Sequence, residues 1–113
     1  MEKESAIGAL AALAQETRLD VFRVLVQAGP EGLPAGAIAA ALGIPSATLS
    51  FHLKELKSSG LVLCDRQGRS RVYSPDLSAV NELITFLTAN CCQGVSGSGS
   101  AGAGRDLDSE AGC

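Results

Sequence analysis

The four cysteines are the residues with the most chemical information in this chain of 113 residues. Cys91 and Cys92 are adjacent, and Cys113 stands at the end of the sequence. Neighbouring Cα atoms are about 3.8 Å apart, below the range of roughly 4.4–6.8 Å that disulfides prefer, so a bond within the pair would be strained. We therefore expect two free thiols that lie close to one another.

This set of sulfur ligands favours a soft trivalent ion over zinc. Thiolates without nitrogen ligands suit a three-coordinate centre such as As(III) or Sb(III), whereas Zn(II) prefers four ligands that include histidine or more cysteine. We predict that the ion is bound by Cys91, Cys92 and Cys113, because the segment before Cys113 has a coil span of about 25 Å and can reach its own pair or a partner's. Cys64 is the competing third ligand, but it lies in a predicted strand and is expected to be a small apolar filler.

Ordinary packing is the alternative for part of this pair. Cys91 alone continues the apolar stripe of the preceding helix, as a core residue would, whereas Cys92 leaves that stripe. We expect the pair at a helix C-terminus, where the negative end of the dipole raises a thiol pKa, which argues against a nucleophilic thiol enzyme. The sequence also lacks a nucleophile–base pair, a phosphate-binding loop and paired carboxylates, so we do not expect an enzyme.

The helix that carries the pair is predicted to begin near Ser74-Pro75-Asp76, with Pro75 in the first helical position and Asp76 at the positive helix end. Its apolar residues follow spacings of 3, 4, 3 and 4, and two more widen the stripe: Leu77, Val80, Ile84, Leu87, Cys91, Leu83 and Phe86. Such a pattern is typical of a helix–helix seam. An Ala-rich helix over residues 5–15 has its own stripe of Ile7, Leu10 and Leu13. Pairing of these end helices between two subunits predicts a homodimer.

Further helices are predicted between the two end helices. The second helix should be capped by Thr17 and end at Gly29-Pro30, with its inward face made by Leu19, Phe22, Leu25 and Val26. The third should begin near Pro34 and bury Ile38 and Leu42. A short turn of Gly, Ile and Pro leads directly into the next helix, so these two form a predicted helix-turn-helix.

The helix that begins at Ser46 has the residue types of a DNA-reading helix. Ser46 is the predicted N-cap, and Leu49, Leu53 and Leu56 form an inward face at i, i+4 and i+7. The opposite face is predicted to carry short polar groups and then two ammonium groups: Thr48, Ser50, Phe51, His52, Lys54 and Lys57. A small polar first turn and a cationic end suit the major groove of DNA, whereas the alternative is an ordinary amphipathic surface helix.

After Gly60 the pattern changes to two β-prone runs, residues 61–66 and 70–74, around a short glycine-bearing turn. They predict a hairpin whose arginines favour a wing along the phosphate backbone, with an exposed, arginine-decorated hairpin as the alternative. We assign base contacts or nearby phosphate bonds to Ser46, Thr48, Ser50 and His52. We assign salt-dependent affinity for DNA to Lys54, Lys57, Arg66, Arg69 and Arg71.

Composition limits the remaining possibilities. A net charge of −3 argues against indiscriminate coating of nucleic acid, although residues 17–75 hold seven Lys/Arg against four Asp/Glu. No apolar run reaches the ~18–20 residues of a membrane span, and the N-terminus lacks the pattern of a signal peptide, so we expect a cytoplasmic protein with reduced cysteines. Residues 1–92 are predicted to form one domain, and residues 93–113 a flexible tail rich in Gly, Ser and Ala.

The predicted order of elements resembles the ArsR/SmtB family of metal- and metalloid-sensing transcriptional repressors. The resemblance covers about Leu10 to Cys92, and its most specific stretches are ETRLDVFRVL (16–25), LSFHLKELKSSGLV (49–62), RQGR (66–69) and Tyr73. It implies a mainly α winged helix-turn-helix with a β-hairpin wing, in the order α-α-α-α-β-β-α, that dimerises through its terminal helices. It also implies a reading helix in the major groove of double-stranded operator DNA, which is released when inducer binds, with no cofactor required.

Two inducer sites of that family are missing from this chain. Residues 39–42 lack the Cys-Val-Cys motif of many arsenic-sensing relatives, and the Asp/His zinc set of the last helix is absent. What remains resembles relatives with a vicinal cysteine pair at the end of that helix, which sense trivalent arsenicals. The resemblance implies a repressor of metalloid resistance genes induced by As(III), or by Sb(III) or a trivalent methylated arsenical. The alternatives are a redox-responsive repressor, in which Cys92 or Cys113 is oxidised, and a winged-helix module for protein contacts.

Overall fold

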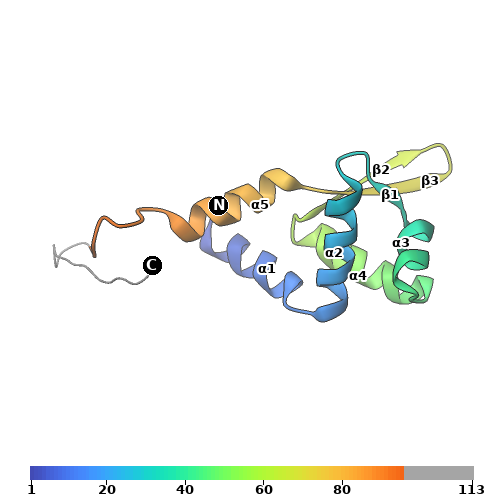
Figure 1. The fold of residues 1–113 in the computed structure, drawn as a ribbon, viewed down its shortest axis with the longest axis horizontal. Coiled ribbons are helices and arrows are strands. Elements are labelled where there is room, and N and C mark those ends of the chain that lie inside the picture. The colour runs from blue at the N-terminus through green and yellow to red at the C-terminus, as the bar shows by residue number, and fades with distance from the viewer. Residues whose placement is uncertain (96–113) are drawn as a thin grey trace.

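The computed structural model describes residues 1–95, which form helices and one small antiparallel sheet (Figure 1). Within this range the elements are α1 (Lys3–Leu13), α2 (Glu16–Ala28), β1 (Leu33–Pro34), α3 (Ala35–Leu42), α4 (Ser46–Ser58), β2 (Val62–Gln67), β3 (Ser70–Pro75) and α5 (Leu77–Thr88). The predicted mainly α fold with a β-hairpin is confirmed. Residues 96–113, with Cys113, lie outside the described residues, so the division into a domain and a tail stays a prediction.

The hydrophobic core lies where α2, α3 and α4 meet the base of the hairpin. Its most completely buried large side chains are Val21, Leu25, Ile38, Leu49, Leu53, Leu56, Leu61 and Val62. The predicted inward face of α4 is confirmed, since its three leucines are each at most 1% exposed. Burial of one such side chain stabilises by about 1.5–3 kcal/mol, so α4 is held firmly in place.

The helix-turn-helix is formed by α3 and α4, whose axes are bent by 113° at the turn between them. This angle falls within the range of roughly 90–120° that is usual for the motif. Gly43 ends α3 with a left-handed backbone (φ 65°), which lets the chain reverse within a few residues. Apart from this bent pair, no helix among residues 1–95 has the length and apolar composition to cross a membrane.

The predicted hairpin of β2 and β3 is extended by a short third strand that the sequence did not predict. β1 pairs with β3 and brings Leu33 opposite Tyr73. The preceding Gly32 has a φ of +78° and lies so close to the Tyr73 carbonyl oxygen that a Cβ atom would collide with it. Pro34 therefore belongs to the strand and forms the N-cap of α3, instead of lying in its first turn.

The caps of α2 and α4 differ from the prediction. Gln15, not Thr17, caps α2, because the chain becomes helical earlier and the Gln15 side chain accepts a 2.8 Å hydrogen bond from the Arg18 backbone N–H. In α4, Ser46 is already helical and Pro45 occupies the N-cap position, with no side-chain hydrogen bond there. The N-terminal N–H groups of α4 therefore have no partner from a capping side chain.

The start of α5 is tied to the core. Pro75 ends β3 and is not the first helical residue that the sequence predicted. Asp76 caps the helix, since its carboxylate accepts a 3.2 Å hydrogen bond from the Ala79 backbone N–H. The Asp76 backbone N–H donates to the carbonyl of Leu61 at 2.9 Å, between α4 and β2. The N-terminal end of α5 is thus fixed beside the C-terminal end of α4.

The inward face of α1 is shifted by one residue from the predicted stripe. Ala6, Ala9 and Ala12 are buried, whereas Ile7 and Leu10 are 58% and 44% exposed. The alanines recur at the same helical spacing as the larger residues, so the spacing alone does not identify the buried side. Their small side chains let α1 lie close to α2 and α4, and Ile7 and Leu10 point away from the core, whereas Leu13 at the end of the helix packs against it.

Of the four residues of α2 that were predicted to face inward, Phe22 and Leu25 are buried as predicted, and the prediction is wrong for the other two. Leu19 and Val26 are 43% and 42% exposed, and Val21 occupies the core instead. The physical reason lies in the orientation of the first turn of α2, where the polar Arg18 reaches α4 and makes a hydrogen bond there.

That hydrogen bond joins Arg18 to His52. His52 is 8% exposed, so the prediction that it lies on the outer face of α4 is wrong. It stands one helical turn from both Leu49 and Leu56, on the inward side. Its Nδ1 accepts a 3.2 Å hydrogen bond from Arg18 Nε. Burial, followed by the positive charge of Arg18, lowers the pKa of His52 below its ordinary value of 6.5.

The lowered pKa predicts that mild acid destabilises the fold through His52, the only histidine in the sequence. The folded protein favours the neutral imidazole, whereas the unfolded chain takes up a proton as the pH falls through about 6.5. The free energy of unfolding should therefore decrease as the pH falls from about 7 toward the lower pKa of the folded state. Urea titrations on the two sides of this window measure the decrease, which a His52→Gln variant should lose. If the free energy of unfolding of this variant decreases equally, groups other than His52 cause the decrease.

Candidate DNA interface and thiol pair

The outer face of α4 presents most of the residues that the sequence assigned to DNA. Those found exposed, as predicted, are Ser46, Thr48, Ser50, Lys54 and Lys57. His52 leaves this set because it is buried. Phe51, to which no DNA contact was assigned, is 54% exposed on the same face. The structure therefore keeps Phe51 on the outer face, as predicted, and places only His52 on the inward side.

The wing carries its three arginines at exposed positions near the end of the hairpin. Arg66 pairs with Arg71 across β2 and β3, and Arg69 lies in the turn between the strands. Like charges directly opposite one another are unfavourable in an isolated sheet, so this arrangement favours a polyanionic partner. Figure 1 shows the hairpin projecting past α3, at the opposite end of the molecule from the last turn of α5.

Arg18 of α2 reaches across to α4 and contacts Phe51 as well as His52. Its guanidinium carbon lies 5.5 Å from the centroid of the Phe51 ring. The rings of Phe51 and His52 meet edge to face, with centroids 5.6 Å apart and planes inclined by 62°. Arg18 thus links a buried imidazole to an exposed phenyl ring. Sequence reasoning missed this cluster because Arg18 and His52 are 34 positions apart and no periodic pattern relates them.

Cys91 and Cys92 lie in the turn that follows α5, with both side chains exposed. The helix ends at Thr88, so the prediction that Cys91 continues the apolar stripe of the helix is wrong. The chain leaves the helix at Ala89, which has an extended ψ of 137°, and Asn90 and Cys92 then adopt positive φ angles of 60° and 69°. The two Sγ atoms are 2.8 Å apart, which confirms the predicted proximity. The hydrogen bond with Cys91, then its charge, and then burial raise the pKa of the Cys92 thiol.

Two exposed sulfurs at this separation can bind one soft ion together. Metal–sulfur bonds are about 2.3 Å long, so two sulfurs on a common ion are at most about 4.6 Å apart. The Sγ–Sγ distance of 2.8 Å lies below that limit, so both sulfurs can reach one ion once the side chains open to the bond angles at that ion. A raised thiol pKa disfavours the nucleophilic thiolate, and binding must release protons, which suits a strongly thiophilic ion.

Within residues 1–95, no group of three or more Cys, His, Asp or Glu residues could hold a metal ion. Cys64 therefore does not join the pair in this arrangement. It lies in β2 as predicted, half-buried opposite Tyr73, whose pKa is raised by burial and then by the Cys64 thiol. Cys113 is outside the described residues, so its assignment as the third ligand stays a prediction.

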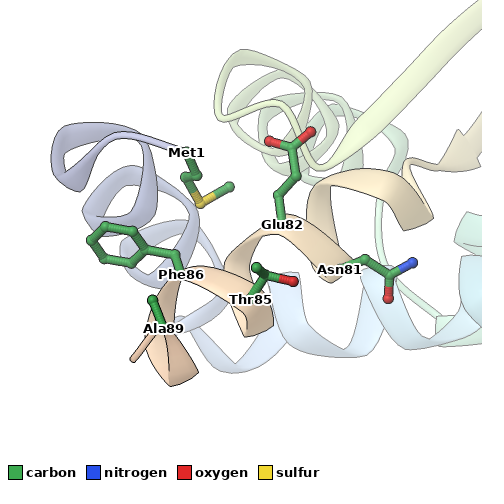
Figure 2. Close-up of a pocket in the computed structure, with 6 residues that line it drawn as sticks. All are labelled: Met1, Asn81, Glu82, Thr85, Phe86 and Ala89. Atoms are coloured by element: carbon green, nitrogen blue, oxygen red, sulfur yellow. The ribbon is translucent and has the colours of Figure 1, made fainter. Parts of the chain in front are cut away.

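α1 and α5, which lie side by side (Figure 1), both leave large apolar side chains exposed. The more exposed of these are Ile7, Leu10, Leu77, Ile84, Phe86 and Leu87. In the predicted stripe of α5, Leu83 alone is fully buried within the described chain. An open hollow of about 400 Å³ lies between Met1 and α5, lined by Phe86 and its neighbours (Figure 2). Phe86 lies on the other side of α5 from Ile84, so we name the remaining exposed residues, Ile7, Leu10, Leu77, Ile84 and Leu87, the α1/α5 face.

Known proteins are similar to this chain in sequence and in fold. A family model described as a helix-turn-helix domain matches residues 13–65. The nodulation protein NolR of Rhizobium meliloti is 32% identical over 87 residues, which cover 77% of this chain and 69% of NolR. Among solved structures, an ArsR-like transcriptional regulator from Rhodococcus sp. RHA1 is similar with a TM-score of 0.67 and 26% identity, over 74% of this chain and 76% of the other.

A further solved structure resembles the chain in its described part. It is the homodimeric winged helix-turn-helix DNA-binding domain of Mb0332 from Mycobacterium bovis, a possible ArsR-family transcriptional regulator. The TM-score is 0.63 at 28% identity, and the similarity covers 75% of this chain and 77% of that domain. On these similarities, this chain belongs to the ArsR/SmtB family of winged helix-turn-helix transcriptional regulators, as its sequence pattern predicted.

Proposed function

We propose that this regulator is a homodimeric repressor that leaves its operator when trivalent arsenic binds Cys91 and Cys92. The observation that carries the choice of inducer is the pair of exposed sulfurs, 2.8 Å apart, beyond the end of α5. Thiolates without nitrogen ligands suit As(III), and Sb(III) or a trivalent methylated arsenical has related chemistry. A methylated arsenical needs only these two sulfurs, whereas inorganic arsenite would take a third, for which we propose Cys113.

The proposed DNA surface joins the outer face of α4 to the wing. Five exposed cations supply affinity through phosphate contacts that release counterions: Lys54, Lys57, Arg66, Arg69 and Arg71. The small polar residues of the first turns, Ser46, Thr48 and Ser50, contact base edges or nearby phosphates. The bend of 113° between α3 and α4 supports this proposal, because it lets α4 enter the major groove while α3 stays outside.

The proposed partner of the α1/α5 face is the same face of a second copy. Several large apolar side chains there are exposed in one chain, including Ile7 at 58% and Leu87 at 59%. Covering apolar surface is favourable by about 25 cal/mol per Å², so the face gains from a partner. The similar domain of Mb0332 is homodimeric, which supports a homodimer for this chain. Two α4 helices would then face half-sites about 34 Å apart on a two-fold symmetric operator.

The proposed link between inducer and operator is α5. Its first residues are held beside α4 by the hydrogen bond from Asp76 to the Leu61 carbonyl, and its other end leads into the thiol pair. An ion bound to the pair and a further sulfur would change how the end helices of the two subunits pack, and hence the separation of the two α4 helices. A coupling of about 1–3 kcal/mol, which is typical of allostery, weakens operator binding roughly 5–150-fold.

The inducer assignment predicts that arsenite lowers operator affinity in the wild type and not in the double variant Cys91→Ser/Cys92→Ser. Removing both sulfurs removes the ligands while leaving the DNA surface unchanged. Fluorescence anisotropy with promoter DNA, titrated with arsenite, antimonite, methylarsenite and zinc, measures the effect. Cys64→Ser is the matched control, since that thiol lies in β2, and it should respond like the wild type.

Two results would contradict this assignment. Release of DNA by arsenite from the double variant would exclude the pair as the sensor. Release by peroxide but by none of the ions, abolished in Cys92→Ser, would favour a redox-responsive repressor, for which the close approach of the two sulfurs is also suitable.

The role of the wing predicts that Arg69→Ala weakens binding without changing which operator is preferred. One phosphate contact fewer should reduce the slope of log K against log salt by about 0.9 per subunit. Binding isotherms over a range of salt concentrations, on the operator and on a shuffled duplex, measure the slope and the preference. Arg23→Ala, an exposed arginine of α2, is the charge-matched control. A changed preference in Arg69→Ala would contradict a pure backbone role.

The proposed dimer predicts that Ile84→Glu/Leu87→Glu yields a monomer. Both side chains are more than half exposed in one chain, so the variant should fold, whereas two charges per subunit in an apolar seam are strongly unfavourable. Light scattering after gel filtration measures the mass. Leu63→Glu alters an equally exposed leucine on β2 and should leave the dimer intact. A monomeric wild type at micromolar concentration would refute the arrangement.

A further inference from the structure

Phe51 lies at the outermost position of α4. At 100° per residue, it stands about 160° around the helix axis from both Leu49 and Leu53, which point into the core. Ala47 and Lys54 lie on the same side, four residues before and three residues after it. A helix that enters a groove with its outer face forward therefore leads with the Phe51 ring.

The ring is held in this position by contacts from one side. The Arg18 guanidinium lies 5.5 Å from its centroid, and the His52 ring meets it edge to face with 5.6 Å between the two ring centroids. Both partners are fixed in turn, because Arg18 Nε donates to His52 Nδ1 at 3.2 Å and His52 is buried. Despite these contacts the ring remains 54% exposed, so its other side is open to solvent.

The first two turns of α4 contain few groups that read bases by paired hydrogen bonds. Residues 46–53, SATLSFHL, include no Asn, Gln, Arg or Lys, which are the side chains that bind adenine or guanine in a bidentate way. What they offer on the outer face is hydroxyl groups and the apolar surfaces of Ala47 and Phe51. Apolar side chains recognise the C5-methyl group of thymine in the major groove.

We propose that Phe51 is a specificity-determining residue, whose ring packs against a thymine methyl group in each half-site, with Arg18 as its positioning residue. This inference rests on the proposed binding of operator DNA through α4. It goes further because it names the base that the protein reads and the apolar contact that reads it. Arg18 acts from α2, through the ring of Phe51, and need not touch a base.

Deoxyuridine differs from thymidine only by the missing methyl group, so it tests this contact directly. A duplex is first selected by the wild-type protein from a random-sequence pool, and each thymine is then replaced in turn by deoxyuridine. Replacement of the contacted thymine should weaken wild-type binding about fourfold per half-site, the value of one buried methyl group. Phe51→Ala should bind the thymine and uracil duplexes equally well. Lys57→Ala is the control, because it should weaken both duplexes and keep the ratio.

The positioning role is tested by the same ratio. Arg18→Gln keeps an amide donor near His52 but removes the cation from the Phe51 ring, so the thymine-to-uracil ratio should fall toward one. Arg18→Lys restores a cation and should recover part of the ratio. A merely structural role of Arg18 would instead lower the stability of the fold and leave the ratio unchanged.

The outcomes separate this inference from the function on which it rests. If no sequence is enriched and the wild type binds no duplex, the proposed repressor function fails. If the wild type binds a selected duplex but no thymine replacement changes its affinity, or if Phe51→Ala keeps the ratio, the role of Phe51 is overturned while the repressor function stands.

Discussion

The buried face of α4 is the constraint on which the rest of the molecule depends. Three leucines with at most 1% exposure and one buried histidine fill the space between this helix, α2 and α3. Rotating α4 about its axis would expose the three leucines at a cost of about 1.5–3 kcal/mol each, and their sum exceeds the roughly 1–3 kcal/mol of a single bidentate base contact. The outer face is therefore oriented before DNA arrives, and binding need not order it.

The other end of the molecule, formed by α1 and α5, leaves large apolar side chains exposed. α1 contributes alanines to the core and turns Ile7 and Leu10 outward, while α5 buries only Leu83 fully among the residues of its stripe. Small residues facing inward and large apolar residues facing outward would be a poor arrangement for an isolated domain, because a small chain already buries little of its surface. It is a suitable arrangement for a subunit whose end helices pack against a second copy.

Strong periodic patterns predicted the fold, whereas the choice between neighbouring residues needed the structure. Leu49, Leu53 and Leu56 have no competing apolar neighbours, so their inward face followed from spacing alone. His52 stands one helical turn from both Leu49 and Leu56, so the period already indicated its inward position, whereas its partner Arg18, 34 positions away, needed the structure. In α1 two apolar stripes share one period, and β1, with two residues, is too short to show any period.

In the proposed mechanism the thiol pair and the dimer seam depend on one another. Because Cys91 and Cys92 lie beyond Thr88, an ion can join them without breaking the hydrogen bonds of α5, including the one from Thr88 Oγ1 to the Ile84 carbonyl at 2.8 Å. For the same reason an ion bound there exerts no force on the core, since both cysteine side chains are exposed in the described chain. To move α5, the bound ion must also contact a group outside the described residues. That group is either a sulfur of the following segment or a part of the partner subunit. In the proposed mechanism, therefore, two sulfurs capture the ion, and a contact across the seam turns its capture into a signal.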